Sequence, residues 1–281
     1  MTRFARLSRQ IVFTLLGFLA ALAFMLPVIW MFTSSLRPNA EIFAHFHPLS
    51  WHSIWPREWT LANISGLMGT GFGRSLLNSL IVTAITTVVG ISMALLAGFA
   101  LSVLTFPGQN LLFGFFVIGF SVPFDAVAVP LSATVRDLGL TNSYFGLSLA
   151  GLGNGFAIYL LRQFFAGIPK SLAEAARLDG ASWLRVLWSV YLPISKGPVI
   201  AAGLTLFVFQ WQAYLWPLLI STRPDMQVGP VALASLVSLA GTVDFSQMFA
   251  GALVLSIVPA GLMLWLQRYF VNSVARSGMT G

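Results

Sequence analysis

The sequence predicts an all-α integral membrane protein with six transmembrane helices. Hydrophobic residues make up 57% of the 281 residues and charged residues only 8%, whereas soluble domains carry about 25% charged residues. Lipid must therefore replace water around most of the chain. Six segments are also apolar over the roughly 20 residues that a spanning helix needs, and they cover residues 11–33, 76–104, 111–135, 143–165, 198–221 and 248–266.

Helices are expected because a spanning backbone must pair its own polar groups, and the alternation typical of barrel strands is absent. The first segment follows Arg3, Arg6 and Arg9 and is similar to a signal peptide. Its apolar run is longer than the 7–15 residues of such a peptide, and it ends in Trp30-Met31-Phe32 without a small-residue cleavage site. We therefore expect a retained first helix and a single domain over residues 1–281.

The distribution of basic residues predicts that both termini are cytoplasmic, because Lys and Arg accumulate in cytoplasmic loops. With the N-terminus inside, ten basic residues fall on the inner side and five on the outer side. The inner set is Arg3, Arg6, Arg9, Arg162, Lys170, Arg177, Arg185, Lys196, Arg268 and Arg276, and the outer set is Arg37, Arg57, Arg74, Arg136 and Arg223.

Composition also excludes several kinds of chemistry. The chain has no cysteine, which excludes disulfides, thiolate catalysis and cysteine metal sites. His45, His47 and His52 share one polar loop, but no carboxylate cluster accompanies them, so no metal is expected. The net charge of +7 is spread between apolar spans and indicates topology, not nucleic acid. No Gly-x-x-x-x-Gly-Lys-Ser/Thr motif occurs, so the chain should not hydrolyse ATP.

Two loops stand out. The outer loop, residues 34–73, contains Trp51, Trp55 and Trp59. Such residues gather at membrane interfaces, and sugar stacking is the alternative. The inner loop, residues 166–197, is the most charged segment and holds Lys170, Glu174, Arg177, Asp179, Arg185 and Lys196.

The inner loop is predicted to contain two short helices. Ser171 and Glu174 have the spacing of a capping box, residues 172–179 favour helix, and Gly180 suits the left-handed residue that ends one. Ser182 is expected to cap a second helix that stops near Leu192-Pro193. A helix of about eight residues needs a packing partner, and physics alone leaves open whether that partner is the membrane surface or a cytoplasmic protein.

The same loop resembles the EAA loop of binding-protein-dependent ABC importer permeases. The resemblance rests on Glu174-Ala175-Ala176, then Gly180, then Val190-Tyr191-Leu192-Pro193, after the fourth of six spans. Val190 stands where the pattern has Ile. The resemblance extends to the carbohydrate branch, the maltose and glycerol-3-phosphate type, through Asn78-Ser79, Val122-Pro123 and residues 209–219. Gln212 stands where that branch often has Asn.

The resemblance implies a non-catalytic subunit in a bacterial inner membrane, with no cofactor of its own. It implies four kinds of partner: a second permease subunit in a heterodimer, two ATP-binding subunits that bind ATP and Mg, an extracytoplasmic solute-binding protein and membrane lipid. Residues implied to couple the chain to the ATPase are Glu174, Ala175, Ala176, Asp179, Gly180, Leu192 and Pro193. A sugar or a glycerol phosphodiester is expected as solute, with amino acids, phosphate or peptides as the alternative classes.

Polar residues within the spans are candidates for the solute pathway: Asn78, Asp125, Asn154, Tyr159, Gln210, Gln212 and Tyr214. Asp125 is the only acid placed inside a span, where charge is costly. Alternatively, Asp125 lies near the outer end of the span and is hydrated. The polar residues of the fifth span could equally form hydrogen bonds between helices. A secondary transporter is the second reading, although no inverted repeat is evident. A membrane-embedded enzyme ranks last.

Overall fold

The computed structural model describes residues 3–239 and 243–277, with side chains for residues 10–237 and 243–267. Five arginines of the orientation count have side chains outside the described residues: Arg3, Arg6, Arg9, Arg268 and Arg276. Every described residue in a regular element is helical, as the sequence predicts.

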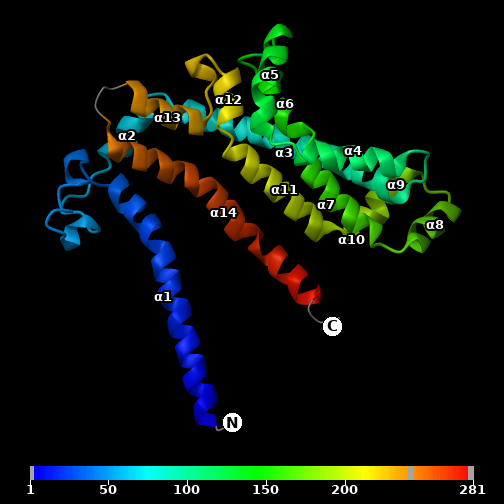
Figure 1. Cartoon of the computed structure of the whole chain (residues 1–281), viewed down its shortest axis with the longest axis horizontal. Helices are drawn as coiled ribbons and strands as arrows, with labels where there is room; N and C mark the ends of the chain where they lie inside the picture. The colour runs from blue at the N-terminus through cyan, green and yellow to red at the C-terminus, as the bar shows by residue number, and fades with distance from the viewer. Residues whose placement is uncertain (1–2, 240–242, 278–281) are drawn as a thin grey trace. The chain divides into compact units, whose positions relative to one another are not determined.

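Three single helices are long and apolar enough to cross a membrane (Figure 1): α1 (Arg3–Ser35), α3 (Phe72–Val103) and α14 (Phe245–Ser277). Three bent pairs pass the same test when each pair counts as one span. They are α4 (Gln109–Ser121) with α5 (Phe124–Asp137), α6 (Tyr144–Leu152) with α7 (Gly155–Ala166), and residues 183–194 with α11 (Lys196–Trp211). The described residues thus contain up to six candidate spans, one of which includes residues 183–194 that the sequence places in the inner loop.

The expectation of a continuous helix over residues 111–135 is wrong. The axes of α4 and α5 differ by 96°. Val122 is extended, with φ −73° and ψ 123°, and Pro123 follows it. Proline lacks an N–H and disfavours helix in the residue before it, so the helix stops and restarts in a new direction. The expected span over residues 143–165 is likewise two helices, bent by 44° at Gly153 and Asn154.

The expected span over residues 198–221 is also interrupted. Here α11 ends at Trp211, and a separate short helix, α12 (Leu215–Ile220), follows. The apolar stretch that precedes α11 consists of α9 (Trp183–Val186), a π-helical turn (Leu187–Tyr191) and α10 (Leu192–Ile194), and its axis lies at 89° to α11. Elements that the sequence did not predict are α2 (Ala62–Gly69), α13 (Gly229–Leu239) and the 3-10 turns Asn39–Glu41, Trp51–Ser53 and Pro224–Met226.

The chain divides into two compact units. The first unit comprises residues 1–72 and 233–257, and the second comprises residues 73–232 and 258–281. That residues 1–281 act as one domain stays a prediction.

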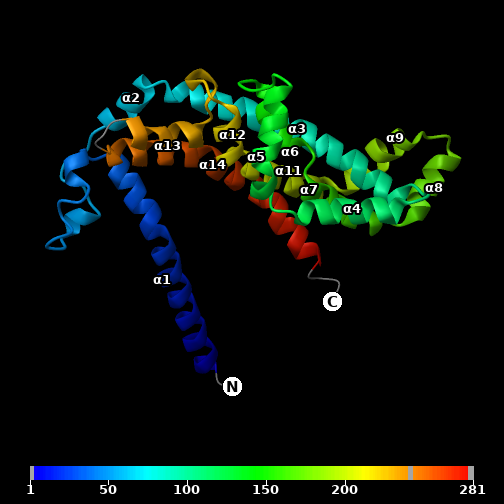
Figure 2. The ribbon, with the colours of Figure 1, turned by 45° about the horizontal axis from the view of Figure 1, so that its top comes forward.

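In the second unit, α7 packs against both α4 and α11 (Figures 1 and 2). It also lies close to α3, because a Cβ at Gly98 would stand 3.1 Å from the backbone nitrogen of Arg162. The buried core of this part contains Phe99, Leu161, Phe165 and Tyr191 with their neighbours. In lipid there is no hydrophobic driving force between helices, so helices that approach this closely are held together by van der Waals packing.

In the first unit, a buried arginine organises the loop after α1. Arg37 has no exposed surface, and its guanidinium donates to the carbonyl oxygens of His52 at 3.2 Å, Ser53 at 3.3 Å and Ile54 at 2.8 Å. Burial lowers the pKa of Arg37, and the charge of Glu41 opposes that shift. The planar fork of five donors suits several carbonyl acceptors at once.

The same loop is tied to the start of α14. Asn63 donates to the carbonyl oxygens of Ser35 at 2.9 Å and Arg37 at 2.8 Å, and it accepts a hydrogen bond from the hydroxyl of Ser246 at 3.1 Å. Asp244 caps α14 by accepting from the backbone N–H of Gln247 at 3.1 Å. Two distant segments of sequence therefore form one unit.

We predict that Arg37→Lys loosens this loop. Lysine keeps the charge but cannot reach three carbonyl oxygens in one plane, and each buried acceptor left unpaired costs about 1–3 kcal/mol. Limited proteolysis of the purified protein should cut residues 38–61 faster than in the wild type. Arg57→Lys is the matched control, because Arg57 is exposed and its substitution should change nothing. Equal cleavage rates in the two variants would contradict the role of Arg37.

Candidate functional site

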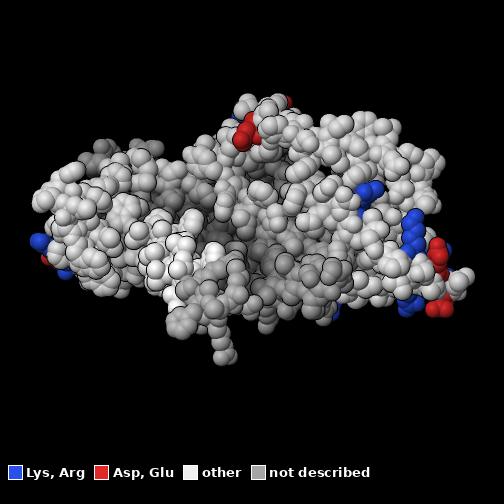
Figure 3. All heavy atoms as spheres, turned by 60° about the horizontal axis from the view of Figure 1, so that its bottom comes forward, with Lys and Arg blue, Asp and Glu red and all other residues white. Residues whose placement is uncertain are grey.

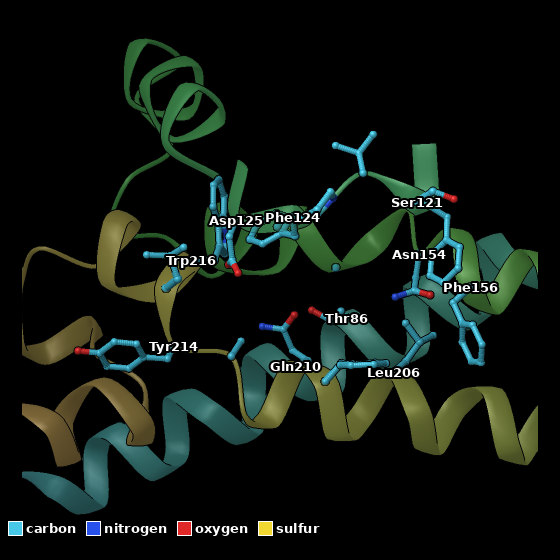
Figure 4. Close-up of a pocket in the computed structure, with 18 residues that line it drawn as sticks. Thr86, Ser121, Phe124, Asp125, Asn154, Phe156, Leu206, Gln210, Tyr214 and Trp216 are labelled. Atoms are coloured by element: carbon cyan, nitrogen blue, oxygen red, sulfur yellow. The ribbon is translucent and has the colours of Figure 1, made fainter. Parts of the chain in front are cut away.

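A pocket of about 480 Å³ lies within the second unit (Figure 4). Its walls come from four places: α3, the break between α4 and α5, the break between α6 and α7, and the break between α11 and α12. The lining residues are Thr86, Phe120, Ser121, Val122, Pro123, Phe124, Asp125, Ala150, Gly151, Asn154, Phe156, Leu206, Phe209, Gln210, Ala213, Tyr214, Leu215 and Trp216. Three helix interruptions thus open onto one space, whereas the 89° bend between Ile194 and Lys196 does not line it.

Several polar groups converge there. Gln210 rises from α11, and the carboxylate of Asp125 reaches in from the first turn of α5 (Figure 4). Asn154 lies across the space from them and caps α7, with its Oδ1 accepting from the backbone N–H of Ala157 at 2.9 Å. The amide nitrogen of Asn154 has no bond to any described residue and lies on the pocket side.

Gly151 permits this convergence. A Cβ added there would stand 2.4 Å from a methyl carbon of Thr86 and 2.6 Å from Oε1 of Gln210. Both distances are too short for a real Cβ contact, so glycine lets the side chains of Thr86 and Gln210 lie against the backbone of α6, and a larger residue would displace them. The pocket is therefore shaped by backbone proximity as well as by side chains.

The pocket walls are firmly held on one side. Trp216 is buried and donates its indole N–H to the carbonyl oxygen of Gly146 at 3.1 Å. The ring of Phe124 meets Trp216 edge to face, with centroids 6.0 Å apart. Such a pair adds about 0.5–1.5 kcal/mol beyond area burial.

Four of the predicted pathway residues meet in this pocket: Asp125, Asn154, Gln210 and Tyr214. Three do not line it. Tyr159 stacks on Phe113 with centroids 6.1 Å apart and accepts from Gln163 at 3.1 Å. Gln212 is exposed at the end of α11.

The third residue outside the pocket, Asn78, holds a loop. Its amide donates to the carbonyl oxygens of Asp225 and Gln227, both at 2.9 Å, and its Oδ1 accepts from the hydroxyl of Tyr144 at 2.9 Å. The side chain is fully buried, and its amide nitrogen and its Oδ1 both have hydrogen-bond partners. Arg223 holds the same loop on its outer side, and its hydrogen bond lowers the pKa of Asp225.

Sequence reasoning missed Thr86, Ser121 and the aromatic walls. The helix-breaking residues could have indicated the pocket, because Pro123 and the Gly153-Asn154 pair lie at two of the three interruptions that line it. Metal binding finds no support at this pocket, and the described residues contain no group of three or more His, Asp or Glu that could hold an ion.

A second feature is α8 (Lys170–Leu178), the short helix of the charged loop. Ala173 is buried against the core and Ala176 is half-buried, so one face of α8 packs on the helix bundle. Leu178 lies opposite this face and retains 89% of its accessible surface, and Leu172, beside the packed face, retains 42%. Glu174 is exposed as well. Charged atoms gather at the end of this unit that carries α8 and α9 (Figure 3).

The end of α8 follows the prediction, and its start does not. Gly180 has φ +83°. Its N–H bonds to the carbonyl of Arg177 at 3.0 Å, and the N–H of Ala181 bonds to that of Ala176 at 3.0 Å, which is the Schellman pattern. The capping box is wrong, because Pro169 occupies the cap position and no side chain caps the helix. Ser171 already lies inside the first turn, where its hydroxyl cannot reach the free N–H groups.

Ser182 caps the second helix as predicted, accepting from the backbone N–H of Arg185 at 3.3 Å. The helical stretch ends at Ile194, one residue beyond the predicted stop near Leu192-Pro193. The helical path continues through Ile194, because Pro193 falls in the first turn of α10, where a missing N–H costs little. Leu192 packs against the core and Pro193 is exposed.

This arrangement, with interrupted apolar spans around a polar pocket and an exposed helix on a charged loop, is that of a membrane transport subunit. Residues 87–276 match the family described as the inner membrane component of binding-protein-dependent transport systems. The chain belongs to this family, and it is a permease component of the inner membrane.

Relatives with assigned functions agree with this membership. The chain is 33% identical over 213 residues to the sn-glycerol-3-phosphate transport system permease protein UgpE of Yersinia pestis, covering 75% of this chain and 76% of the relative. It is 32% identical over 254 residues to GgtD of Synechocystis, an osmoprotective compounds uptake permease, covering 89% and 85%.

The fold recurs in a crystal structure of a bacterial ABC transporter involved in the import of the acidic polysaccharide alginate. The match has a TM-score of 0.78 and 24% identity, and it covers 96% of this chain and 99% of the other. A second alginate transporter structure, in complex with a pentasaccharide-bound periplasmic protein, matches with a TM-score of 0.60 and 14% identity.

We predict that Asn78→Leu destabilises the protein. The substitution leaves the carbonyl oxygens of Asp225 and Gln227 without their donor, at about 1–3 kcal/mol for each buried unpaired group. The thermal unfolding temperature of the purified protein in detergent should fall, whereas exposed Gln212→Ala should leave it unchanged. An unfolding temperature equal to that of Gln212→Ala would show that Asn78 does not hold the loop.

Proposed function

We propose that this chain is the permease of an ATP-driven importer of polyhydroxylated solutes, with sugars and glycerol phosphodiesters as the candidate classes. Support comes from the names of two relatives, a glycerol-3-phosphate permease and an osmoprotective compounds permease. The composition of the pocket agrees, because amide and carboxylate groups among aromatic rings suit hydroxylated molecules better than peptides or free amino acids.

The proposal that import is driven by ATP rests on the exposed side of α8. A nine-residue helix with exposed Leu172 and Leu178 is too short to be stable alone. Its inner face already packs on the bundle through Ala173. On the side away from Ala173, the exposed Leu178 and Glu174 therefore offer a surface to a protein partner. We propose that this partner is a separate ATP-binding subunit.

Energy must come from such a partner, since the sequence contains no phosphate-binding loop. We propose an assembly of this chain with a second, different permease subunit, two ATP-binding subunits that bind ATP and Mg, and an extracytoplasmic solute-binding protein. Movement of α8 with the ATPase would then bias the spans between two states. Glu174, Ala175, Asp179 and Gly180 lie at or beside the outer face of α8.

Orientation follows from the basic residues. We propose that both termini and the loop of residues 166–197 are cytoplasmic, because ten of fifteen Lys and Arg residues then lie inside. This places α8 on the side where ATP is available. The tryptophan-containing loop, residues 34–61, then lies outside.

We predict that Gly180→Leu uncouples the permease from its ATPase. Leucine at a positive φ costs about 1–2 kcal/mol, and its side chain would project beside α8. The variant should reach the membrane normally, but the amount of ATPase that copurifies and the rate of solute uptake should both fall at least about tenfold.

Gly139→Leu is the matched control. Gly139 has φ +69°, and the N–H groups of Gly139 and Leu140 form the same closing pattern after α5. An added Cβ meets no atom within 4 Å at Gly139 or at Gly180, so the backbone strain is comparable. Copurified ATPase should stay at the wild-type level in this control. Wild-type copurification and uptake in Gly180→Leu would exclude the docking role of α8.

We predict that positions 8 and 59 lie on opposite sides of the membrane. The chain has no cysteine, so Ser8→Cys and Trp59→Cys each introduce a single thiol. In intact cells, a membrane-impermeant maleimide should label position 59 only, and permeabilised cells should show both. Labelling of position 8 in intact cells would reverse the proposed topology.

A further inference from the structure

One bend of the second unit does not line the pocket, and it sets a helical stretch across the direction of a span. Residues 183–194, here called the transverse stretch, have an axis at 89° to α11. The helix α11 has 16 residues and rises about 24 Å at 1.5 Å per residue. Because a hydrocarbon core is roughly 30 Å thick, the start of α11 lies close to its boundary. A helix at right angles to the span there runs along the membrane plane.

Side-chain packing fixes the transverse stretch at the level where two spans end. Tyr191 is buried, and its ring meets those of Phe99 and Phe165 edge to face, with centroids 5.1 Å and 5.6 Å away. Phe99 lies in the last two turns of α3, and Phe165 lies in the last turn of α7. Val186 and Leu187 are buried in the same cluster. One face of the stretch therefore packs on the end of the helix bundle.

A second face of the transverse stretch is apolar and uncovered. Leu184 and Trp188 lie one turn apart and are 59% and 53% exposed, and the indole N–H of Trp188 has no partner among the described residues. Ile194, directly before α11, is exposed as well. Large apolar side chains exposed together mark an interaction surface. Tryptophan is enriched where an apolar ring meets the polar headgroups of a bilayer.

A third face of the transverse stretch is polar and positively charged. Arg185 and Ser189 lie one turn apart and are exposed, and Lys196 is exposed directly after the stretch. Neither Arg185 nor Lys196 forms an ion pair with a described residue, and residues 183–194 include no acid. A helix with tryptophan and leucine on one face and basic residues on another is typical of the membrane interface, where the basic residues attract anionic lipid.

We infer that residues 183–194 form an interfacial helix that binds anionic phospholipid. Leu184 and Trp188 lie among the acyl chains, and Arg185 and Lys196 contact the phosphate groups. This lipid site goes beyond the proposed import function, and by the proposed orientation it belongs to the cytoplasmic leaflet. The stretch packs against α8 through α9 and leads into α11, so bound lipid supports the connection between the proposed ATPase contact and a span.

The first measurement identifies what surrounds the apolar face. The chain has no cysteine, so Leu184→Cys and Trp188→Cys each provide a single site for a nitroxide label. The full-length chain with cysteine-free associated subunits would be placed in nanodiscs of phosphatidylcholine and phosphatidylglycerol. Molecular oxygen relaxes a nitroxide in lipid, and a water-soluble nickel chelate relaxes one in water. We expect oxygen to dominate at both positions. Ser189→Cys is the matched control, on the polar face, where nickel should dominate.

The second measurement identifies the class of lipid. A bimane label on Trp188→Cys would be quenched by spin-labelled phosphatidylglycerol or by spin-labelled phosphatidylcholine at equal mole fraction. Phosphatidylglycerol should quench more strongly. Arg185→Gln should lower this preference by up to about fivefold, as the loss of one basic residue near an anionic surface predicts. Arg136→Gln removes an equal, exposed charge outside the stretch and should leave the preference unchanged.

Relaxation at positions 184 and 188 mainly by nickel would place the apolar face in water, and relaxation by neither agent would place it in a protein interface. Either result would overturn the interfacial helix. Equal quenching by the two lipids would overturn the preference for anionic phospholipid. Neither measurement involves ATP or solute, so these failures leave the proposed importer intact. A complex without ATP-dependent uptake would contradict the importer and leave the lipid site standing.

Discussion

A backbone that crosses a membrane cannot leave its N–H and C=O groups unpaired, and the rest of this structure depends on that constraint. Where a span is broken, a local group restores the pairing. Asn154 caps α7 with its side chain, and the N–H of Val122 bonds to the carbonyl of Gly119 at 3.4 Å. Three interruptions of the second unit gather around a single pocket, whereas the bend between Ile194 and Lys196 does not line it. The position of the pocket is thus a consequence of backbone chemistry before it is a matter of solute recognition.

The same constraint explains why several buried polar side chains serve the fold. Arg37 and Asn63 satisfy carbonyl oxygens of the loop after α1, and Asn78 satisfies those of the loop before α13. In each case one side chain replaces the water that a loop carbonyl would otherwise need. Thr86 differs from these residues, because its hydroxyl is equally buried but has no such partner among the described residues. The hydroxyls of Thr83, Thr87 and Ser148 are likewise buried without a partner among the described residues, so an open hydrogen bond does not by itself mark a functional residue.

Features written in a few neighbouring residues could be predicted. Gly180 and Ser182 end one helix and begin the next, as local dihedral preference and side-chain reach require. The capping box at Ser171 could not be confirmed, because the start of α8 depends on how the chain leaves α7 through Pro169. Among the pathway candidates, Asp125 and Gln210 face the pocket, while Asn78 and Tyr159 face other partners. Composition identifies polar residues in a span but does not give the direction in which each one points.

The sequence by itself determined that this protein is a helical membrane permease, because apolar length, scarce charge and the EAA-loop motif are properties of residues close together in the chain. Only the tertiary structure decided which spans are bent and which polar groups meet. Proline and glycine permit a break, but they do not give the axis angles, which are 96° and 44° in the structure. The approach of α3 and α11 to Gly151 brings Thr86 and Gln210 together. Such contacts join residues 65 and 59 positions apart (151 − 86 and 210 − 151), and the energy that fixes them exists only once the helices are packed.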